Sequence, residues 1–304
     1  MKVYLHLGVH KTGSSFLQKE FFSEYKNQIL FIDRSNLLEF KSYILHTDDF
    51  AFQSEKALDI FNSIVSNSES RDRVILSDEE FYGNPFMGVL DRKRNIDRLI
   101  NVFGDSLHVL MFIRNQQSLL HSLYKQYVKT GGIANFSSFI SYKRYPLFFN
   151  IDYLKYDKYL NYLKFKLGQS RIKVLLYEEF INNKQGILQE IDSFVKNEVS
   201  NYEFLPKKDI RVNSSLKSGN VPIMRFFNKL TKSPKEPFLL FHIIFHKAIR
   251  KFLVKLNFEF LRKRKFFLTD ELSIEDIKES NYNLKKQFKE LKIEENNYLI
   301  RKAT

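Results

Sequence analysis

The stretch from residue 3 to residue 17, VYLHLGVHKTGSSFL, joins three patterns that decide the fold. Val3 to Leu7 is a short apolar run typical of a buried strand, and residues 8–15 form a turn of mostly small side chains. From Phe16 to Gln28 the apolar residues have helical spacing. A turn in this position can present backbone N–H groups and the positive end of a helix to an anion. Because the turn also holds Lys11 and two serines, it predicts an anion-binding loop.

The order of residues in this turn differs from that of a Walker A loop, G-x-x-x-x-G-K-S/T. Here Lys11 comes two residues before Gly13, whereas the Walker A lysine directly follows its glycine. The alternative is an ordinary strand-to-helix turn without a ligand. The coincidence of a lysine, a glycine and two serines at this place favours anion binding.

Three further apolar runs, residues 74–76, 107–113 and 172–176, alternate with helical segments, which predicts an α/β fold with a parallel sheet. Polar residues follow each run: Ser77 to Glu80, Arg114 with Asn115, and Glu178 with Glu179. Ligands of such sheets bind at the carboxyl ends of the strands. From about residue 218 the pattern becomes helical. We therefore predict a core domain over residues 1–217 and a basic helical C-terminal region over residues 218–304 that packs on it.

Composition excludes several classes of protein. The 304 residues are 43% hydrophobic and 28% charged, as in a globular chain, and they include no cysteine, which excludes disulfides, thiolate zinc sites and cysteine nucleophiles. No run of 18 apolar residues and no secretory leader pattern occurs, so we expect a cytoplasmic protein without a transmembrane helix. The net charge is +14, but no zinc-finger spacing or RNA-recognition motif accompanies it, so we expect no nucleic-acid partner.

Residues 6–18, HLGVHKTGSSFLQ, strongly resemble the 5′-phosphosulfate loop of sulfotransferases, in the version found in bacterial carbohydrate sulfotransferases. These enzymes use 3′-phosphoadenosine 5′-phosphosulfate (PAPS) and release adenosine 3′,5′-bisphosphate (PAP). The resemblance implies a P-loop-like three-layer fold, a parallel sheet flanked by helices, with an all-helical C-terminal extension. It also implies that the 5′-phosphosulfate is held by residues of this loop, namely Lys11, Thr12, Gly13, Ser14, Ser15 and Phe16.

Two more segments match the same family. Arg114 at the end of a strand, with Ser122 eight residues later, resembles the motif that binds the 3′-phosphate. An arginine can bind a phosphate bidentately, which suits this role. Residues 211–215, RVNSS, look like the R-x-N-x-S loop that closes over the nucleotide, which implies cofactor contacts from Arg211, Asn213 and Ser215. The resemblance covers about residues 1–217 and residues 280–284.

The implied reaction is in-line transfer of a sulfuryl group from PAPS to a hydroxyl of a carbohydrate: a polysaccharide, lipopolysaccharide or glycolipid. Lys11 is expected to neutralise the leaving phosphate, so no metal is required. Glu79 is expected to be the general base, because residues 77–81 resemble the family's S-S-E segment. Asp78, Glu80 and His10 remain alternatives, because a shift of one residue changes which carboxylate faces the site and because an imidazole titrates near neutral pH. A solvated acidic turn without a catalytic role is a further alternative.

The C-terminal region concentrates positive charge. From Arg225 to Lys265 twelve lysines and arginines face two glutamates, a net charge of +10 in 41 residues. Residues 238–261 predict an amphipathic helix with a basic stripe. It is interpreted first as a helix packed on the core with a solvated face. The alternatives are that residues 238–265 bind an anionic membrane, which would place the enzyme at the inner membrane face near lipid-linked acceptors, or that they bind an acidic polysaccharide.

Two other features leave alternatives open. Tyr153, Tyr156, Tyr159 and Tyr162 recur every three residues, a pattern that favours a helix packing face over a sugar-binding platform. For the whole chain, the competing functions are a P-loop nucleotide kinase or other phosphotransferase, and a non-catalytic protein that binds polyanions or membranes.

Overall fold

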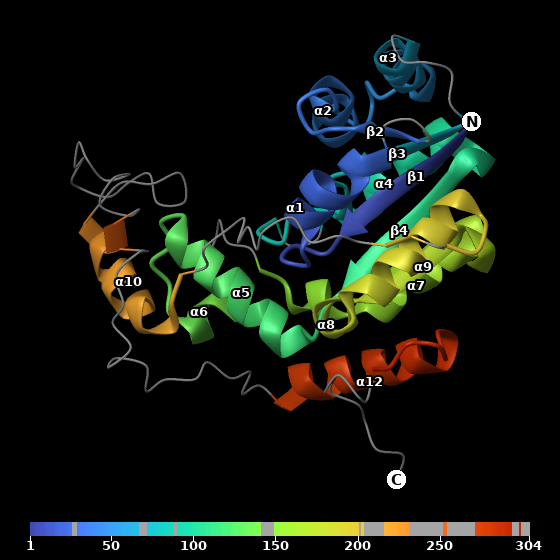
Figure 1. Cartoon of the computed structure of the whole chain (residues 1–304). Helices are drawn as coiled ribbons and strands as arrows, with labels where there is room; N and C mark the ends of the chain where they lie inside the picture. Colours follow the sequence, from blue (N-terminus) through green and yellow to red (C-terminus); the bar gives the residue numbers. More distant parts are fainter. Residues whose placement is uncertain are drawn as a thin grey trace.

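The computed structural model describes residues 1–25, 29–66, 72–87, 90–140, 149–200, 202–203, 216–230, 252–253, 271–293 and 298. In this part of the chain five parallel strands form one sheet in the order β2-β3-β1-β4-β5 (Figure 1). The strands are β1 (Lys2–Gly8), β2 (Leu30–Ile32), β3 (Arg73–Ser77), β4 (Leu107–Ile113) and β5 (Ile172–Leu176). The predicted α/β class with a parallel sheet is confirmed. Strand β2 was not predicted, because three residues at a sheet edge give too short a pattern.

The central strand β1 is buried on both sides, as its continuous apolar sequence predicts. Val3, Leu5 and Leu7 contribute to one hydrophobic cluster, whereas Tyr4 contributes to the other. Successive side chains of a strand point to opposite faces, so the two clusters lie on opposite faces of the sheet. The molecule therefore has three layers.

Helices cover each face of the sheet. One face carries α1 (Ser14–Phe16) with the π- and 3₁₀-helical turns that continue it to Tyr25, together with α8 (Tyr177–Asn182) and α9 (Lys184–Lys196). The other face carries α2 (Leu38–His46), α3 (Ser54–Ser66), α4 (Arg92–Phe103), α5 (Gln116–Lys129) and α7 (Tyr156–Leu167). The predicted helix over residues 16–28 is thus a series of short helical turns, of which residues 26–28 lie outside the described part.

The strand order places three loops together. The chain moves outward from β1 to the β2–β3 side and then crosses to β4 and β5 on the other side. Parallel pairing aligns His6 with Ser77 and Gly8 with Phe112, so the carboxyl ends of β3, β1 and β4 are adjacent. This reversal of strand order is where ligands bind in open α/β sheets. The glycine-rich turn, the acidic segment after β3 and Arg114 after β4 all follow these three ends.

The C-terminal helices pack on the core. Helix α10 (Val221–Leu230) lies beside α5, where Asn228 Nδ2 donates hydrogen bonds to the carbonyls of Val128 (2.7 Å) and Gly132 (3.0 Å). Helix α12 (Glu271–Gln287) lies against α7 (Figure 1). Leu284 of this helix and Phe288 and Leu291 after it are buried. The division at residue 217 stays a prediction.

Most of the predicted basic helix lies outside the described residues; Phe252 and Leu253 are helical. Across the described ranges no helix has both the length and the apolar composition needed to span a membrane.

The contact between α12 and the core predicts a measurable contribution to stability. Buried Asn281 pairs with the buried amide of Gln116, which also donates to the Leu154 carbonyl at 3.4 Å. Asn281→Ala leaves the Gln116 amide without this partner, so we expect a loss of about 1–3 kcal/mol in the free energy of unfolding. Urea denaturation measures this, with the exposed Lys286→Ala in the same helix as control. Equal stability of the two variants would contradict this docking.

Candidate active site

The turn after β1 has a strained backbone that its neighbours stabilise. Lys11 has φ +72° and Gly13 has φ +84°, both in the left-handed region. For a residue with a side chain this conformation costs about 1–2 kcal/mol. Thr12 Oγ1 donates a 2.6 Å hydrogen bond to the Val9 carbonyl inside the turn, and Arg114 Nη1 donates a 2.7 Å hydrogen bond to the Lys11 carbonyl from the end of β4. These two bonds hold the turn closed. The Thr12 hydroxyl proton is therefore used in a hydrogen bond within the turn.

Gly8 is needed for the close packing of this turn. A Cβ atom at this position would lie 2.4 Å from Ser14 Oγ and 3.0 Å from Thr12 Oγ1. The absence of a side chain lets the hydroxyl of Ser14, at the start of α1, approach the end of β1. Ser14 is buried and Ser15 is half-buried. The structure thus places the two predicted serines at the first turn of α1, beside the backbone of the loop.

Arg114 is fixed at several points. Its Nε donates to Ser118 Oγ at 2.7 Å, its guanidinium lies 4.7 Å from the centre of the Tyr177 ring, and its carbonyl accepts a 2.6 Å hydrogen bond from Tyr156 Oη. The sequence paired Arg114 with Ser122, but the serine that contacts Arg114 is Ser118. Ser118 was missed, although its spacing of four residues from Arg114 was a usable signal. Ser122 is half-buried one helical turn further along α5.

Positive charge gathers at this end of the sheet. The protein around the Lys11 ammonium group lowers the pKa of Lys11, and the charges of Lys129 and Arg114 lower it further. Lys11 and Arg114 form no ion pair with an acidic side chain within the described part of the chain. An anionic ligand would relieve this repulsion, so the electrostatics fit an anion site.

The acidic segment after β3 is bound to two cations. Asp78 is 2% exposed; its Oδ1 caps the 3₁₀ turn Glu79–Tyr82 by accepting from Glu80 N at 2.9 Å, and its Oδ2 lies 3.1 Å from Lys41 Nζ. Lys41 also lies 3.0 Å from Glu80, which is half exposed. Glu79 is 25% exposed and forms an ion pair with Arg34. Asp78 therefore has a structural role, which leaves Glu79 and Glu80 as the accessible carboxylates.

Ser77 links the acidic segment to the glycine-rich turn. His6 Nδ1 shares a 2.7 Å hydrogen bond with Ser77 Oγ, and Gln18 Nε2 donates to both the carbonyl and the hydroxyl of Ser77 at 3.0 Å. Burial is the main cause that lowers the pKa of His6 to about 3. A neutral, buried His6 is a packing residue.

His10 is hydrogen-bonded to a tyrosine of the 3₁₀ turn Ile151–Leu154, which precedes α7. Its Nδ1 shares a 2.9 Å hydrogen bond with Tyr153 Oη. Burial lowers the pKa of His10 to about 4, and the Lys11 charge adds to this effect. Tyr153, Tyr156 and Tyr159 are buried, so their three-residue spacing is a packing face, as predicted. Two of their hydroxyls also support the site, at His10 and at the Arg114 carbonyl.

The remaining predicted cofactor residues fall into two groups. Phe16 is half-buried, with its ring 5.6 Å from Phe180 and the Lys184 ammonium 4.8 Å above it. Arg211, Asn213 and Ser215 lie outside the described residues. Within the described part, no cluster of three His, Asp or Glu side chains could hold a metal ion.

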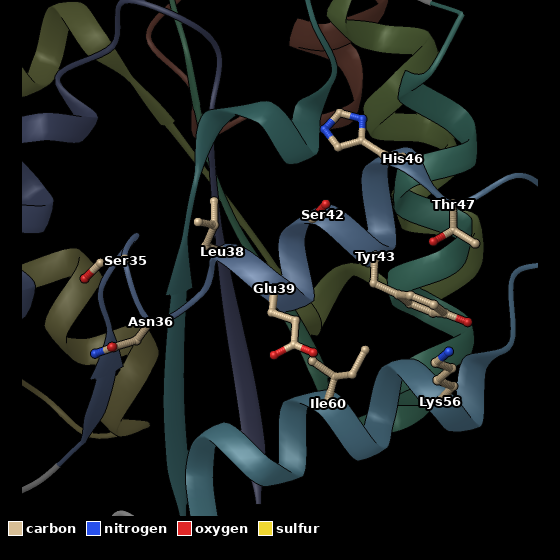
Figure 2. A pocket seen from close by; sticks show the side chains of 10 residues that line it. All are labelled: Ser35, Asn36, Leu38, Glu39, Ser42, Tyr43, His46, Thr47, Lys56 and Ile60. Atoms are coloured by element: carbon tan, nitrogen blue, oxygen red, sulfur yellow. The ribbon is translucent and has the colours of Figure 1, made fainter.

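A hollow of about 830 Å³ lies away from the glycine-rich turn, between α2 and α3 (Figure 2). Its lining is largely polar and includes Ser35, Asn36, Ser42 and His46. None of the predicted cofactor residues contributes to it, so this hollow is separate from the glycine-rich turn and Arg114.

Comparisons with known proteins bear on the fold. No protein-family model and no curated protein matches the chain. A sulfotransferase from Alicyclobacillus acidocaldarius superimposes on it with a TM-score of 0.51 at 14% identity, covering 86% of this chain and 99% of that one. The chain has a sulfotransferase fold.

Two further solved structures align less closely. The sulfotransferase domain from the curacin biosynthetic pathway gives a TM-score of 0.41 at 12% identity, with 68% of this chain and 75% of that one covered. Retinol dehydratase, in complex with androsterone and the inactive cofactor PAP, gives a TM-score of 0.36 at 11% identity. The alignment covers 99% of this chain and 82% of that one.

His6 and His10, whose pKa values are lowered by burial, predict a dependence of stability on pH. Their folded pKa values, about 3 and 4, lie below the unfolded value of about 6.5, so below pH 6.5 the unfolded chain binds protons that the folded chain rejects. Stability is therefore expected to fall as pH drops from 6.5 toward 4, by about 1.4 kcal/mol per pH unit for each histidine. Urea denaturation of His10→Gln should give a shallower slope than wild type, whereas the exposed His46→Gln should not. An unchanged slope in His10→Gln would contradict the shielding.

Proposed function

We propose that this chain transfers the sulfuryl group of PAPS to a hydroxyl group of a carbohydrate. The observation that carries the proposal is the bond from Arg114 to the Lys11 carbonyl, which joins the two predicted phosphate-binding segments at the reversal of strand order. The acidic segment that would supply a base follows the neighbouring strand β3. An anion site, a lysine and a carboxylate are the groups that sulfuryl transfer requires.

The residues present fit the 5′-phosphosulfate and 3′-phosphate of PAPS. Gly8 lets the Ser14 hydroxyl approach the end of β1, and the donors around the turn are hydroxyls, backbone N–H groups and the cations Lys11 and Arg114. We assign Lys11, Ser14 and Ser15 to the 5′ group, and Arg114 with Ser122 to the 3′-phosphate. When bound, PAPS would supply an activated sulfuryl group and a phosphate leaving group.

Lys11 would stabilise the charge that develops on the leaving phosphate oxygen. Its pKa is lowered by its protein surroundings and by the charges of Lys129 and Arg114, and this concentration of positive charge would favour an anionic leaving group. Thr12 and Arg114 fix the Lys11 backbone, so the ammonium group would be oriented before the reaction.

Glu79 is the proposed base that accepts the proton of the acceptor hydroxyl. Asp78 is occupied by the cap and by Lys41, and Glu80 pairs with the same lysine. His10 is a weaker candidate, because its Nδ1 already shares a hydrogen bond with the buried Tyr153 hydroxyl. His10 would instead support the loop beside Lys11.

The carbohydrate acceptor rests on the resemblance of residues 6–18 to carbohydrate sulfotransferases. Tyr124, which could have lined an acceptor cleft, is instead buried and donates to the Ala134 carbonyl at 3.1 Å. The cytoplasmic location and the contact of residues 238–265 with an anionic membrane or acidic acceptor also remain proposals.

Ligand binding separates this function from its two rivals. We expect PAP to raise the melting temperature, because it carries both phosphates that the site would hold. A nucleotide kinase would respond to ATP with Mg²⁺, and a polyanion-binding protein would respond to neither. Arg114→Ala should abolish the PAP shift; PAP stabilisation that survives this change would contradict the assignment.

Turnover distinguishes the roles of Lys11 and Glu79. Lys11→Ala should lower kcat about 10²-fold, equivalent to about 3 kcal/mol of leaving-group stabilisation. Glu79→Gln should abolish transfer and leave PAP affinity close to wild type. PAP release from PAPS in the presence of a panel of carbohydrate acceptors measures both. If Glu80→Gln or His10→Ala abolishes transfer and Glu79→Gln does not, the base is misassigned.

A further inference from the structure

Five side chains form a row of alternating charge beside the glycine-rich turn. Glu79 pairs with Arg34, whose Nε lies 3.6 Å from Asp78 Oδ2; Lys41 lies 3.1 Å from the same oxygen and 3.0 Å from Glu80. The two cations thus face three carboxylates. Glu79 lies at one end of this row, where Arg34 is its ion-pair partner.

The residues around Arg34 have other hydrogen-bond partners, so the local fold does not depend on the ion pair between Arg34 and Glu79. The turn that carries Arg34 is closed by Asp33, whose Oδ1 accepts hydrogen bonds from the backbone N–H groups of Ser35 (2.8 Å) and Asn36 (3.0 Å). Asp78 retains Lys41 and the Glu80 N–H as partners without Arg34. The arginine side chain is 43% exposed. Its position beside the proposed base therefore has no evident structural purpose.

The charge of Arg34 acts on the loop end of the sheet. It contributes to the lowered pKa values of His6 and His10, which lie two positions before and two positions after Gly8. A guanidinium paired with a carboxylate favours the ionised form and so reduces its affinity for a proton. The Arg34 side of this pair is in contact with solvent, since its side chain is 43% exposed and that of Glu79 is 25% exposed. Solvent weakens an ion pair, so a bound ligand can compete for one of its partners.

We propose that Arg34 is a positioning residue that pairs with the Glu79 carboxylate while no acceptor is bound and releases it when an acceptor enters. This inference rests on the proposed function and adds a means of regulating the same site. With the pair intact, Glu79 accepts protons poorly, so PAPS is protected from water. With the pair separated, Glu79 is free to take the proton of the acceptor hydroxyl.

The unwanted reaction that Arg34 would suppress is hydrolysis of PAPS. The bond from sulfur to the bridging phosphate oxygen breaks, a bond from sulfur to the water oxygen forms, and Glu79 accepts a water proton. The products are PAP and hydrogen sulfate, which loses its remaining proton to the solvent and becomes sulfate. Water is the only co-reactant, so the reaction can be followed without knowing the acceptor.

Titration of Glu79 tests the pair without turnover. In ¹³C NMR of the full chain, with the Glu79 carboxyl signal assigned from its loss in Glu79→Gln, Arg34→Gln should raise the pKa of Glu79 by about one unit, a tenfold gain in proton affinity. Arg34→Lys should lie between Arg34→Gln and wild type. The other charged or titratable groups near Glu79 are unchanged in these variants: Asp78, Glu80, Lys41, His6 and His10.

Acceptor-free release of PAP from PAPS tests the consequence. Arg34→Gln should raise this rate several-fold, and the double variant Arg34→Gln/Glu79→Gln should return it to the low rate of Glu79→Gln alone. Arg171→Gln is the control, because it removes another arginine–carboxylate ion pair, 3.1 Å from the exposed Asp105, at the opposite end of the sheet. PAP should raise the melting temperature of all these variants equally.

The outcomes distinguish the two proposals. PAP stabilisation with an unchanged Glu79 pKa in Arg34→Gln, or with an unchanged hydrolysis rate, would overturn the role of Arg34 alone. The absence of PAP stabilisation in the wild-type chain would overturn the proposed function and this inference with it.

Discussion

The hydrogen bond from the Arg114 guanidinium to the Lys11 carbonyl joins the loops that follow β1 and β4. Lys11 needs such a partner, because its left-handed backbone is unfavourable for a residue with a side chain. Arg114 in turn is held by Ser118 and Tyr177. The orientation of the lysine therefore depends on an arginine 103 residues away in sequence, and the sheet register that aligns Gly8 with Phe112 makes this contact possible.

Because β1 is the central strand of the sheet, positive and negative side chains follow different strands. Lys11 and Arg114 follow β1 and β4, whereas the three carboxylates follow β3 on the other side. Group transfer to a hydroxyl needs cations near the leaving group and a base near the attacking oxygen. The strand order places the cations and the carboxylates on adjacent loops, as the proposed transfer requires. Ser77 couples them, since it contacts His6 of β1 and Gln18 of the segment that follows the turn.

Local patterns allowed much of this to be predicted from the sequence. Four of the five strands, the turn and the polar residues at the strand ends are signals within a few residues of one another. The partners of those residues were not predictable, because they come from distant segments. Arg34 and Lys41 reach the acidic segment only through the pairing of β2, a three-residue strand without a clear pattern. Ser118 was missed because the family motif directed attention to Ser122. The predicted loop at residues 211–215 and most of the basic helix lie outside the described residues.

The C-terminal segment also contributes to the order of the site, through contacts that its sequence does not reveal. Tyr298 donates a 3.0 Å hydrogen bond to one oxygen of Glu178, and the other oxygen accepts a 3.0 Å bond from the backbone N–H of Asn115. Asn115 directly follows Arg114 and caps α5 through Ser118 N. A residue near the end of the chain thereby fixes the backbone beside the arginine. Burial raises the pKa of Tyr298, so this hydroxyl stays protonated and remains a donor at neutral pH. Tyr298 is thus connected through Glu178 to the backbone that follows Arg114, whereas α12 packs on α7.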